Sequence, residues 1–267
     1  MSAAKVIYDF GSNNGDDIPY YLKKAEKVVA VEANPTLSDQ IRQRFSREIA
    51  DGRLVVECCV LTREKAAAEV YFYRHKSSHV KSQFPEPNSL EIRHFDKMLL
   101  PSRSVIGVIA QHGAPYYIKI DIEHYDEQIL YALFDNDVRP PFLSAEAHNV
   151  RVFGLLASLG GYDSFNLVDG ISVAEKYNQH PILTRSGRET YSFPDHSAGP
   201  FGEDIDGSWM TADNFFRRFA LEGLGWRDIH VTTEIAPDPL AQVRLGDLVN
   251  WSVRRGLARA FRRFRPE

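Results

Sequence analysis

The sequence has few cysteines, no long apolar run and no excess of basic charge over most of its length. Its two cysteines, Cys58 and Cys59, are neighbours, and neighbours on a strand point to opposite faces, which excludes a disulfide framework. No apolar stretch approaches the roughly 20 residues that span a bilayer. The start "MSAAK" leads directly into a predicted strand, so no signal peptide is predicted. We therefore expect a cytoplasmic protein with reduced thiols.

Acidic and basic residues are unevenly distributed along the chain. Residues 240–267 contain seven arginines and two acids, which gives this segment a net charge of +5. The whole chain of 267 residues has a formal net charge of −4, so the remainder carries −9. An acidic body does not predict a nucleic-acid partner. With 43% apolar residues the chain is long enough for one sizeable core, and its oligomeric state stays open.

Strand-like and helix-like segments alternate through the first two thirds of the chain. This alternation predicts an α/β fold with a doubly wound, mostly parallel sheet and helices on both faces. The predicted strands are 5–10, 27–33, 54–61, 69–75, 116–122 and 142–148, and the predicted helices are 18–25, 37–49, 125–134 and 150–160. We divide the chain into three regions. The first is a cofactor-binding core at 1–175, with a polar insertion at about 76–104. The second is an extension or lid at 176–239 with a late strand at 226–235, and the third is a basic amphipathic tail at 240–267.

The stretch "YDFGSNNGDD" at residues 8–17 is the first crossover from a strand to a helix. In such sheets, ligands bind beyond the carboxyl ends of the strands. Gly11 and Gly15 permit tight turns and a close approach of the backbone. Glu32 follows 21 residues after Gly11, at the end of the second strand, where an acid binds the hydroxyls of a ribose. The sequence therefore predicts a cofactor that contains ribose.

The loop also indicates which cofactor this is. A dinucleotide site has the pattern G-x-G-x-x-G, but Asn13 stands where its second glycine would be. Asp16 and Asp17 stand where the pyrophosphate would lie, and they would repel it. S-adenosylmethionine has a ribose and a cationic sulfonium but no phosphate, so we favour it over NAD. The alternative is a plain turn in which Asp17 caps the following helix.

The segment "YIKIDIEHYD" at 117–126, together with "YDFGSNNGDD", "VVAVEANP" and "PFLSAEAH", resembles the FkbM-type methyltransferases. The resemblance extends over roughly residues 5–170. It implies a Rossmann-like class I fold, S-adenosylmethionine as cofactor, and methylation of a hydroxyl on a sugar, polysaccharide or other natural product. One position departs from the pattern, because His124 stands where the family commonly has glycine.

The resemblance also implies which residues form the cofactor site. Glu32 would bind the ribose, and Asp121 and Glu123 would lie near the methyl group. The remaining residues fall into three groups along the bound cofactor. Asp9, Gly11, Asn13 and Gly15 would form the loop on the methionine side, which also contains Asp16; Ala33 and Asn34 would lie beside the adenine; and Cys58, with Glu57 or Val60, would flank its ring.

Methyl transfer to an oxygen requires alignment of the acceptor and removal of its proton. The candidates at predicted strand ends are Asp121, Glu123, His124 and His148. We favour Asp121 as the base or as the acid that orients the acceptor, and place His148 second. Asp121 with Glu146 and His148 is an alternative set of ligands for a divalent ion. No tight ligand spacing supports such a site, so the sequence favours a metal-free reaction.

Two other function classes remain alternatives. One is a non-catalytic nucleotide-binding or scaffold protein on the same fold, and the other is an oxidoreductase, which the missing glycine disfavours. The tail carries an apolar stripe that either packs on its own domain or contacts an anionic membrane at its inner face. The stripe consists of Val249, Val253, Leu257, Phe261 and Phe264, with arginines around it.

Overall fold

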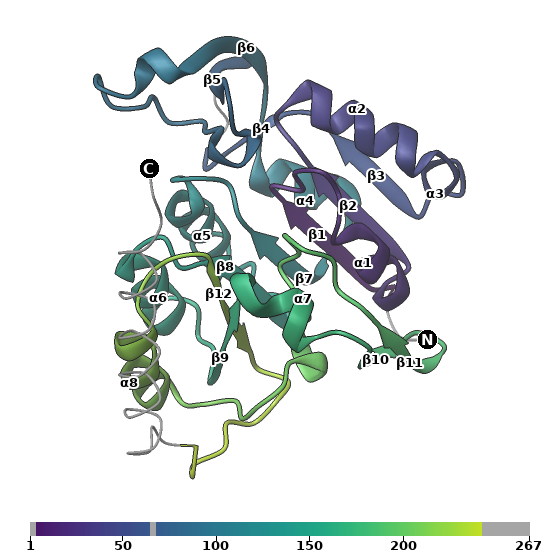
Figure 1. Ribbon diagram of the computed structural model, residues 1–267, viewed down its shortest axis with the longest axis vertical. Coiled ribbons are helices and arrows are strands. Elements are labelled where there is room, and N and C mark those ends of the chain that lie inside the picture. The colour runs from purple at the N-terminus through teal and green to yellow at the C-terminus, as the bar shows by residue number, and fades with distance from the viewer. Residues whose placement is uncertain (1–3, 65–67, 242–267) are drawn as a thin grey trace, which may run out of the picture.

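The computed structural model describes residues 4–64 and 68–241, and its centre is a seven-stranded sheet (Figure 1). The strand order is β3-β2-β1-β7-β8-β12-β9. All neighbouring strands are parallel except β12, which is antiparallel to both β8 and β9. The predicted doubly wound, mostly parallel sheet is therefore confirmed. Its strands are β1 (Val6–Phe10), β2 (Lys27–Val31), β3 (Leu54–Glu57), β7 (Pro115–Ile120), β8 (Phe142–Glu146), β9 (Ser164–Asp169) and β12 (Arg227–Thr232).

The chain enters this sheet in the middle. From β1 it moves outward to β2 and β3, and it then crosses back to β7 on the other side of β1. The strand order therefore reverses between β1 and β7. Open sheets of this kind bind ligands outside the carboxyl ends of the strands at such a reversal.

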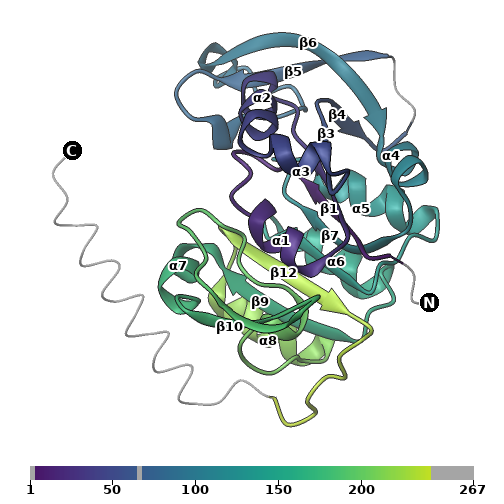
Figure 2. The same cartoon turned by 90° about the vertical axis from the view of Figure 1, so that its right-hand side faces the viewer.

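Helices cover both faces of the sheet, and each face has its own hydrophobic core (Figure 2). Side chains of β1 alternate between them, since Ile7 packs into one core and Tyr8 into the other. The core on the Tyr8 side includes α4 (Val105–His112), α5 (Asp126–Asp135), α6 (Val150–Ser158) and α8 (Ala212–Glu222). The core on the Ile7 side includes α1 (Ile18–Lys24), α2 (Pro35–Arg44), α3 (Ser46–Ala50), α7 (Val173–Lys176) and the hairpin of β10 (His180–Thr184) and β11 (Gly187–Tyr191).

Three predicted segments differ from the structure in more than the position of their ends. The strand predicted at 54–61 leaves the central sheet after β3, and its last part becomes β4 (Val60–Thr62). The insertion at 76–104 contains a ten-residue strand, β6 (Phe95–Ser104), which pairs with β4 and with β5 (Glu69–His75). The helix predicted at 37–49 begins earlier, where Asn34 caps α2, and is interrupted at Phe45.

The late strand expected at 226–235 is β12, and it lies inside the central sheet between β8 and β9. Residues 176–239, expected as an extension or lid, thus contribute a strand to the core. No helix among residues 4–64 and 68–241 is long and apolar enough to cross a membrane. The amphipathic tail expected at 240–267 lies outside the described residues from position 242 onward. In the described part of the chain, short 3-10 turns lie at His79–Lys81, Ile92–His94, Gly170–Ser172 and Gly202–Asp204.

Candidate functional site

The turn after β1 is built around Gly11. The backbone N–H groups of Gly11 and Ser12 both donate to the carbonyl of Val31, at 3.0 and 3.1 Å, which ties the loop to the end of β2. Gly11 has a φ of +88°, and a Cβ at this position would lie 1.8 Å from the carbonyl oxygen of Asp121. Only glycine therefore allows β1 and β7 to meet this closely at their carboxyl ends.

Glu32 stands directly after β2, and its carboxylate fixes the same loop through hydrogen bonds. One carboxylate oxygen accepts from the N–H of Asn13 at 2.8 Å, and the other accepts from the N–H of Asn34 at 2.7 Å. Burial raises the pKa of Glu32 to about 7, although these two hydrogen bonds oppose the shift. The carboxyl group is thus rigidly positioned and titrates near neutral pH.

A cavity of about 510 Å³ opens over these strand ends. One side of it is the loop after β1 with the end of β2, and the opposite side is the segment 79–84 of the insertion. Apolar side chains of β4 and β5 and acids at the ends of β7 and β8 also line it. Of the candidate residues named from the sequence, those that border it are Gly11, Asn13, Glu32, Ala33, Val60, Asp121, Glu123 and Glu146.

The other predicted cofactor residues lie around this cavity without bordering it. Asp9 is fully buried beneath the loop. Asp16 forms an ion pair with Arg44 at 2.8 Å. Cys58 Sγ lies 4.0 Å from the carbonyl oxygen of Ala33. Gly15 and Asn34 serve the local fold, since a Cβ on Gly15 would meet Ile18 and Ile41 at 3.1 Å and Asn34 caps α2.

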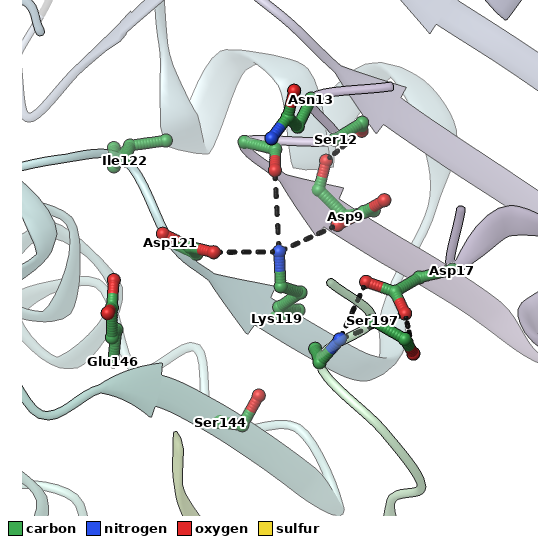
Figure 3. Close-up of polar contacts among 12 residues, drawn as sticks. Asp9, Ser12, Asn13, Asp17, Lys119, Asp121, Ile122, Ser144, Glu146 and Ser197 are labelled. Carbon is green, nitrogen blue, oxygen red and sulfur yellow. Dashed lines mark hydrogen bonds and ion pairs between the residues drawn. The ribbon is translucent and has the colours of Figure 1, made fainter. Parts of the chain in front are cut away.

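Lys119 is a site residue that the sequence reasoning missed. It is 4% exposed on β7, and its ammonium donates to the carbonyl of Gly11 at 3.3 Å (Figure 3). The same Nζ lies 3.2 Å from Asp121 Oδ2 and 3.7 Å from Asp9 Oδ1. Burial raises the pKa of Asp121, but Lys119 outweighs this and holds it below its usual value. The signal in the sequence was a lysine inside the apolar run "YYIKI", since a buried charge requires a partner.

Asp17 does not cap α1, although the sequence analysis considered that role as an alternative. Its side chain makes no capping hydrogen bond to α1. Instead, the carboxylate accepts from the hydroxyl of Ser197 at 2.5 Å and from the N–H of Ala198 at 3.1 Å (Figure 3). Burial raises the pKa of Asp17 to about 6. These bonds fix the loop at 197–199 beside the site, where His196 and Trp226 also border the cavity.

Four side chains at the ends of β7 and β8 form a compact cluster of carboxylates and one imidazole. Asp121, Glu123, Glu146 and His148 each place one potential ligand atom within 4.8 Å of those of the others. His148 Nε2 lies 2.9 Å from Glu146 Oε2 and 3.9 Å from Glu123 Oε2. Burial lowers the pKa of His148, but the bond to Glu146 and the neighbouring carboxylates raise it overall to about 10. In the absence of other cations, the imidazole is therefore protonated at neutral pH.

The carboxyl groups around this imidazole have pKa values above the usual range for acids. Burial raises the pKa of Glu123 to about 8 and that of Glu146 to about 7. Burial also raises the pKa of Asp126 to about 6, and its Oδ2 lies 3.8 Å from His148 Nε2. These acids, crowded at the ends of two neighbouring strands, therefore retain their protons to higher pH than exposed acids do.

His124 lies beside the cluster and does not border the cavity. Its backbone φ is +67°, in the left-handed region that favours glycine. Its ring centroid is 5.6 Å from that of His148, and the ring planes differ by 30°. Burial and the nearby His148 lower the pKa of His124. The left-handed backbone gives a physical reason why a glycine suits this position.

No protein-family model and no curated protein sequence matches the chain. Solved structures that resemble it include several methyltransferases. One is the methyltransferase FkbM from Methylobacillus flagellatus KT, with a TM-score of 0.41 and 16% identity over 63% of this chain and 41% of that chain. Another is the O-methyltransferase from Bacillus cereus in complex with S-adenosylhomocysteine, with a TM-score of 0.37 and 12% identity over 86% of this chain and 74% of that chain.

A third is the precorrin-6Y C5,15-methyltransferase from Geobacter metallireducens GS-15, with a TM-score of 0.37 and 9% identity over 86% of this chain and 81% of that chain. This chain spans less than half the length of the FkbM methyltransferase chain. The likeness lies in the Rossmann-like fold, with its mostly parallel sheet, and carries no argument about substrate or mechanism.

Proposed function

We propose that the protein is an S-adenosylmethionine-dependent methyltransferase that methylates a hydroxyl of a small molecule or glycan. The observation that carries the proposal is the position of Glu32. Its carboxyl group is fixed by two backbone amides and borders the cavity at the end of β2. An acid at this point of a doubly wound sheet is placed to accept hydrogen bonds from both hydroxyls of a ribose.

The start of α1 supports a cofactor without phosphate. In dinucleotide-binding sheets the pyrophosphate lies at the N-terminus of the helix that follows β1. Here the buried carboxylate of Asp17 precedes that helix, and the N–H of Ala198 is already bonded to it. A pyrophosphate at this place would meet a carboxylate and a polypeptide loop. Adenosine joined to a cationic sulfonium has no such conflict.

The position of Asp121 at the end of β7 supports methyl transfer to a hydroxyl. In the proposed complex the loop from Gly11 to Asn13 contacts the methionine end of the cofactor, and Asp121 lies near the methyl group. The cofactor supplies the electrophilic carbon, and the protein aligns the acceptor. Alignment contributes up to about 7–11 kcal/mol in well-oriented systems. Because Lys119 keeps Asp121 ionised, its carboxylate is suited to accept a hydrogen bond from the acceptor hydroxyl and to orient it.

The proposal is tested by ligand-dependent thermal unfolding of the full chain. A ligand that binds only the folded state raises the melting temperature in proportion to the logarithm of its concentration over Kd. We expect S-adenosylhomocysteine and S-adenosylmethionine to raise it by several degrees at saturating concentration, and NAD and ATP to leave it unchanged. Stabilisation by NAD with none by S-adenosylhomocysteine would replace this proposal with an oxidoreductase.

A further inference from the structure

We propose that Asp121, Glu123, Glu146 and His148 together bind one divalent metal cation on the wall of the cavity. This inference rests on the proposed function for its role, because the cation would lie next to the position assigned to the methyl group. The metal site itself is defined by residues of this chain and can be tested independently of the cofactor.

The geometry of the site follows from the strand register. β7 and β8 are parallel neighbours in which Ile120 pairs with Ala145, so Asp121 and Glu146 occupy the next level of adjacent strands. Each places a carboxylate oxygen within 4.8 Å of one from the other. Glu123 and His148 each follow two residues later. One donor atom from each of the four residues lies within 4.8 Å of the others, as donors around a single ion must.

The cations near the cluster are the imidazolium of His148 and the shared ammonium of Lys119. Within residues 4–64 and 68–241, neither Glu123 nor Glu146 has a lysine or arginine in ion-pair contact. The ammonium of Lys119 reaches Asp121 from the other side, but it is shared with the carbonyl of Gly11 and with Asp9. His148 is the cationic group in contact with Glu123 and Glu146, and Glu146 is 8% exposed. Because a metal ligand must be deprotonated, a divalent ion would displace the proton of His148 and take its place between the carboxylates.

The donor set indicates the class of metal. Carboxylates suit magnesium and manganese, whereas imidazole favours transition metals. Three carboxylates with one imidazole therefore fit Mn²⁺ better than they fit Ca²⁺, which takes oxygen ligands only. Asp121, Glu123 and Glu146 border the cavity, so the ion can enter from it and can retain an open position toward it.

The metal would give this wall a function beyond orientation of the acceptor. A bound divalent cation polarises an oxygen that coordinates it and lowers the pKa of the attached proton. An acceptor whose hydroxyl oxygen reaches the open position would then lose its proton more readily during attack on the methyl carbon. The proton would leave to solvent through the cavity, and the cation would remain unchanged in charge.

The test is calorimetric titration of the tag-free full chain, freed of metal by EDTA, with MnCl₂. We expect one equivalent of Mn²⁺ to bind per chain, and electron paramagnetic resonance to show the loss of the free-ion signal. Glu146→Gln and His148→Gln should each weaken binding at least tenfold. The matched control is Asp163→Asn, which neutralises an exposed acid away from the cavity and should leave the affinity unchanged. Circular dichroism establishes that each variant is folded, and two variants are used because one of them could fail to fold.

Two results would overturn the proposal. One is the absence of stoichiometric Mn²⁺ binding by the wild-type chain, and the other is equal binding by the wild type and by both folded ligand variants. The outcome is kept separate from the proposed function by measurement of S-adenosylhomocysteine affinity in the presence of EDTA. If the chain binds S-adenosylhomocysteine in EDTA but has no Mn²⁺ site, the metal proposal is rejected and the proposed methyltransferase function is retained. Mn²⁺ binding without any cofactor affinity leaves the metal site and removes the methyltransferase.

Discussion

The ammonium of Lys119 lies 3.2 Å from Oδ2 of Asp121, and the two residues stand two positions apart at the end of β7. The same ammonium lies 3.7 Å from Oδ1 of Asp9, which is fully buried. Neither carboxylate oxygen of Asp9 has a hydrogen-bond partner among the described residues. Lys119 therefore supplies the compensating positive charge both for Asp9, which is buried beneath the loop after β1, and for Asp121, which borders the cavity.

Replacement of Lys119 by methionine should destabilise the fold strongly. Lys119→Met leaves the buried Asp9 and the partly exposed Asp121 without their cation, and removal of one partner from a buried ion pair, such as Lys119 with Asp9, costs about 3–5 kcal/mol. The measurement is urea denaturation of the full chain at neutral pH. The control is Lys23→Met, because Lys23 pairs with Glu189 at 2.8 Å on the surface, and an exposed pair contributes less than about 1 kcal/mol. Equal losses in the two variants would contradict the structural role of Lys119.

Alanine substitutions at two glycines with left-handed backbones distinguish the effect of backbone strain from that of a steric clash. Gly11 has φ +88° and Gly52 has φ +71°, but a Cβ on Gly52 would meet nothing within 4 Å. Both alanine variants carry the cost of a left-handed residue, roughly 1–2 kcal/mol. Only Gly11→Ala also forces a Cβ against the carbonyl of Asp121, so it should lose S-adenosylhomocysteine binding while Gly52→Ala binds normally. Calorimetry on both folded variants decides this, and normal binding by Gly11→Ala would place the cofactor elsewhere.

The sequence was sufficient for six of the seven central strands, all except β9, and for the side of the cavity formed by the loop after β1 and the end of β2. Apolar strands that end in glycine or acid carry a local signal, so β1, β2 and their loops were placed close to their observed positions. Glu32 could be assigned because its distance along the chain from Gly11 follows from one strand–helix–strand unit. These are short-range relationships, and the backbone geometry of such a unit leaves little freedom.

Long-range relationships were not accessible from the sequence. Asp17 bonds to Ser197 and Ala198, which are 180 and 181 residues away, so nothing near Asp17 indicates that it fixes a distant loop. The cluster at Asp121 and His148 joins two strands that are separated by a whole helix, and no ligand spacing along the chain marks it. The break between β3 and β4 was also missed, because apolar residues and the two cysteines follow Glu57 without a turn signal such as glycine or proline.

Loss of the Glu32 side chain should weaken cofactor binding without loss of the fold. Glu32→Ala removes the group assigned to the ribose hydroxyls, and hydrogen bonds to a charged group contribute about 1.5–3 kcal/mol. We therefore expect the Kd for S-adenosylhomocysteine to rise about 10- to 150-fold. The control is Glu222→Ala, which removes an exposed acid at the end of α8 and should leave Kd unchanged. An unchanged Kd in a folded Glu32→Ala variant would place the ribose elsewhere.

The affinity for S-adenosylhomocysteine should also depend on pH through Glu32. Burial raises the pKa of this carboxyl to about 7, so it is mainly protonated at pH 6 and mainly ionised at pH 8. The ionised form can accept hydrogen bonds from two ribose hydroxyls, whereas the protonated form presents a weaker acceptor. Ligand binding then releases a proton at low pH, and linkage makes Kd about tenfold larger at pH 6 than at pH 8.

Other groups near the cavity titrate in the same range, so the pH experiment needs a variant that isolates Glu32. Burial brings the pKa of Asp17 to about 6 and that of Glu146 to about 7, and Asp9 and Lys119 also act on Glu32 through their charges. Glu32→Gln removes only the titration of residue 32 and keeps its size. Calorimetry in EDTA at pH 6, 7 and 8 should give a steep dependence for the wild type and a flat one for Glu32→Gln. A slope that survives in Glu32→Gln would assign the pH dependence to the other acids, and a wild type without any slope would separate Glu32 from the bound ribose.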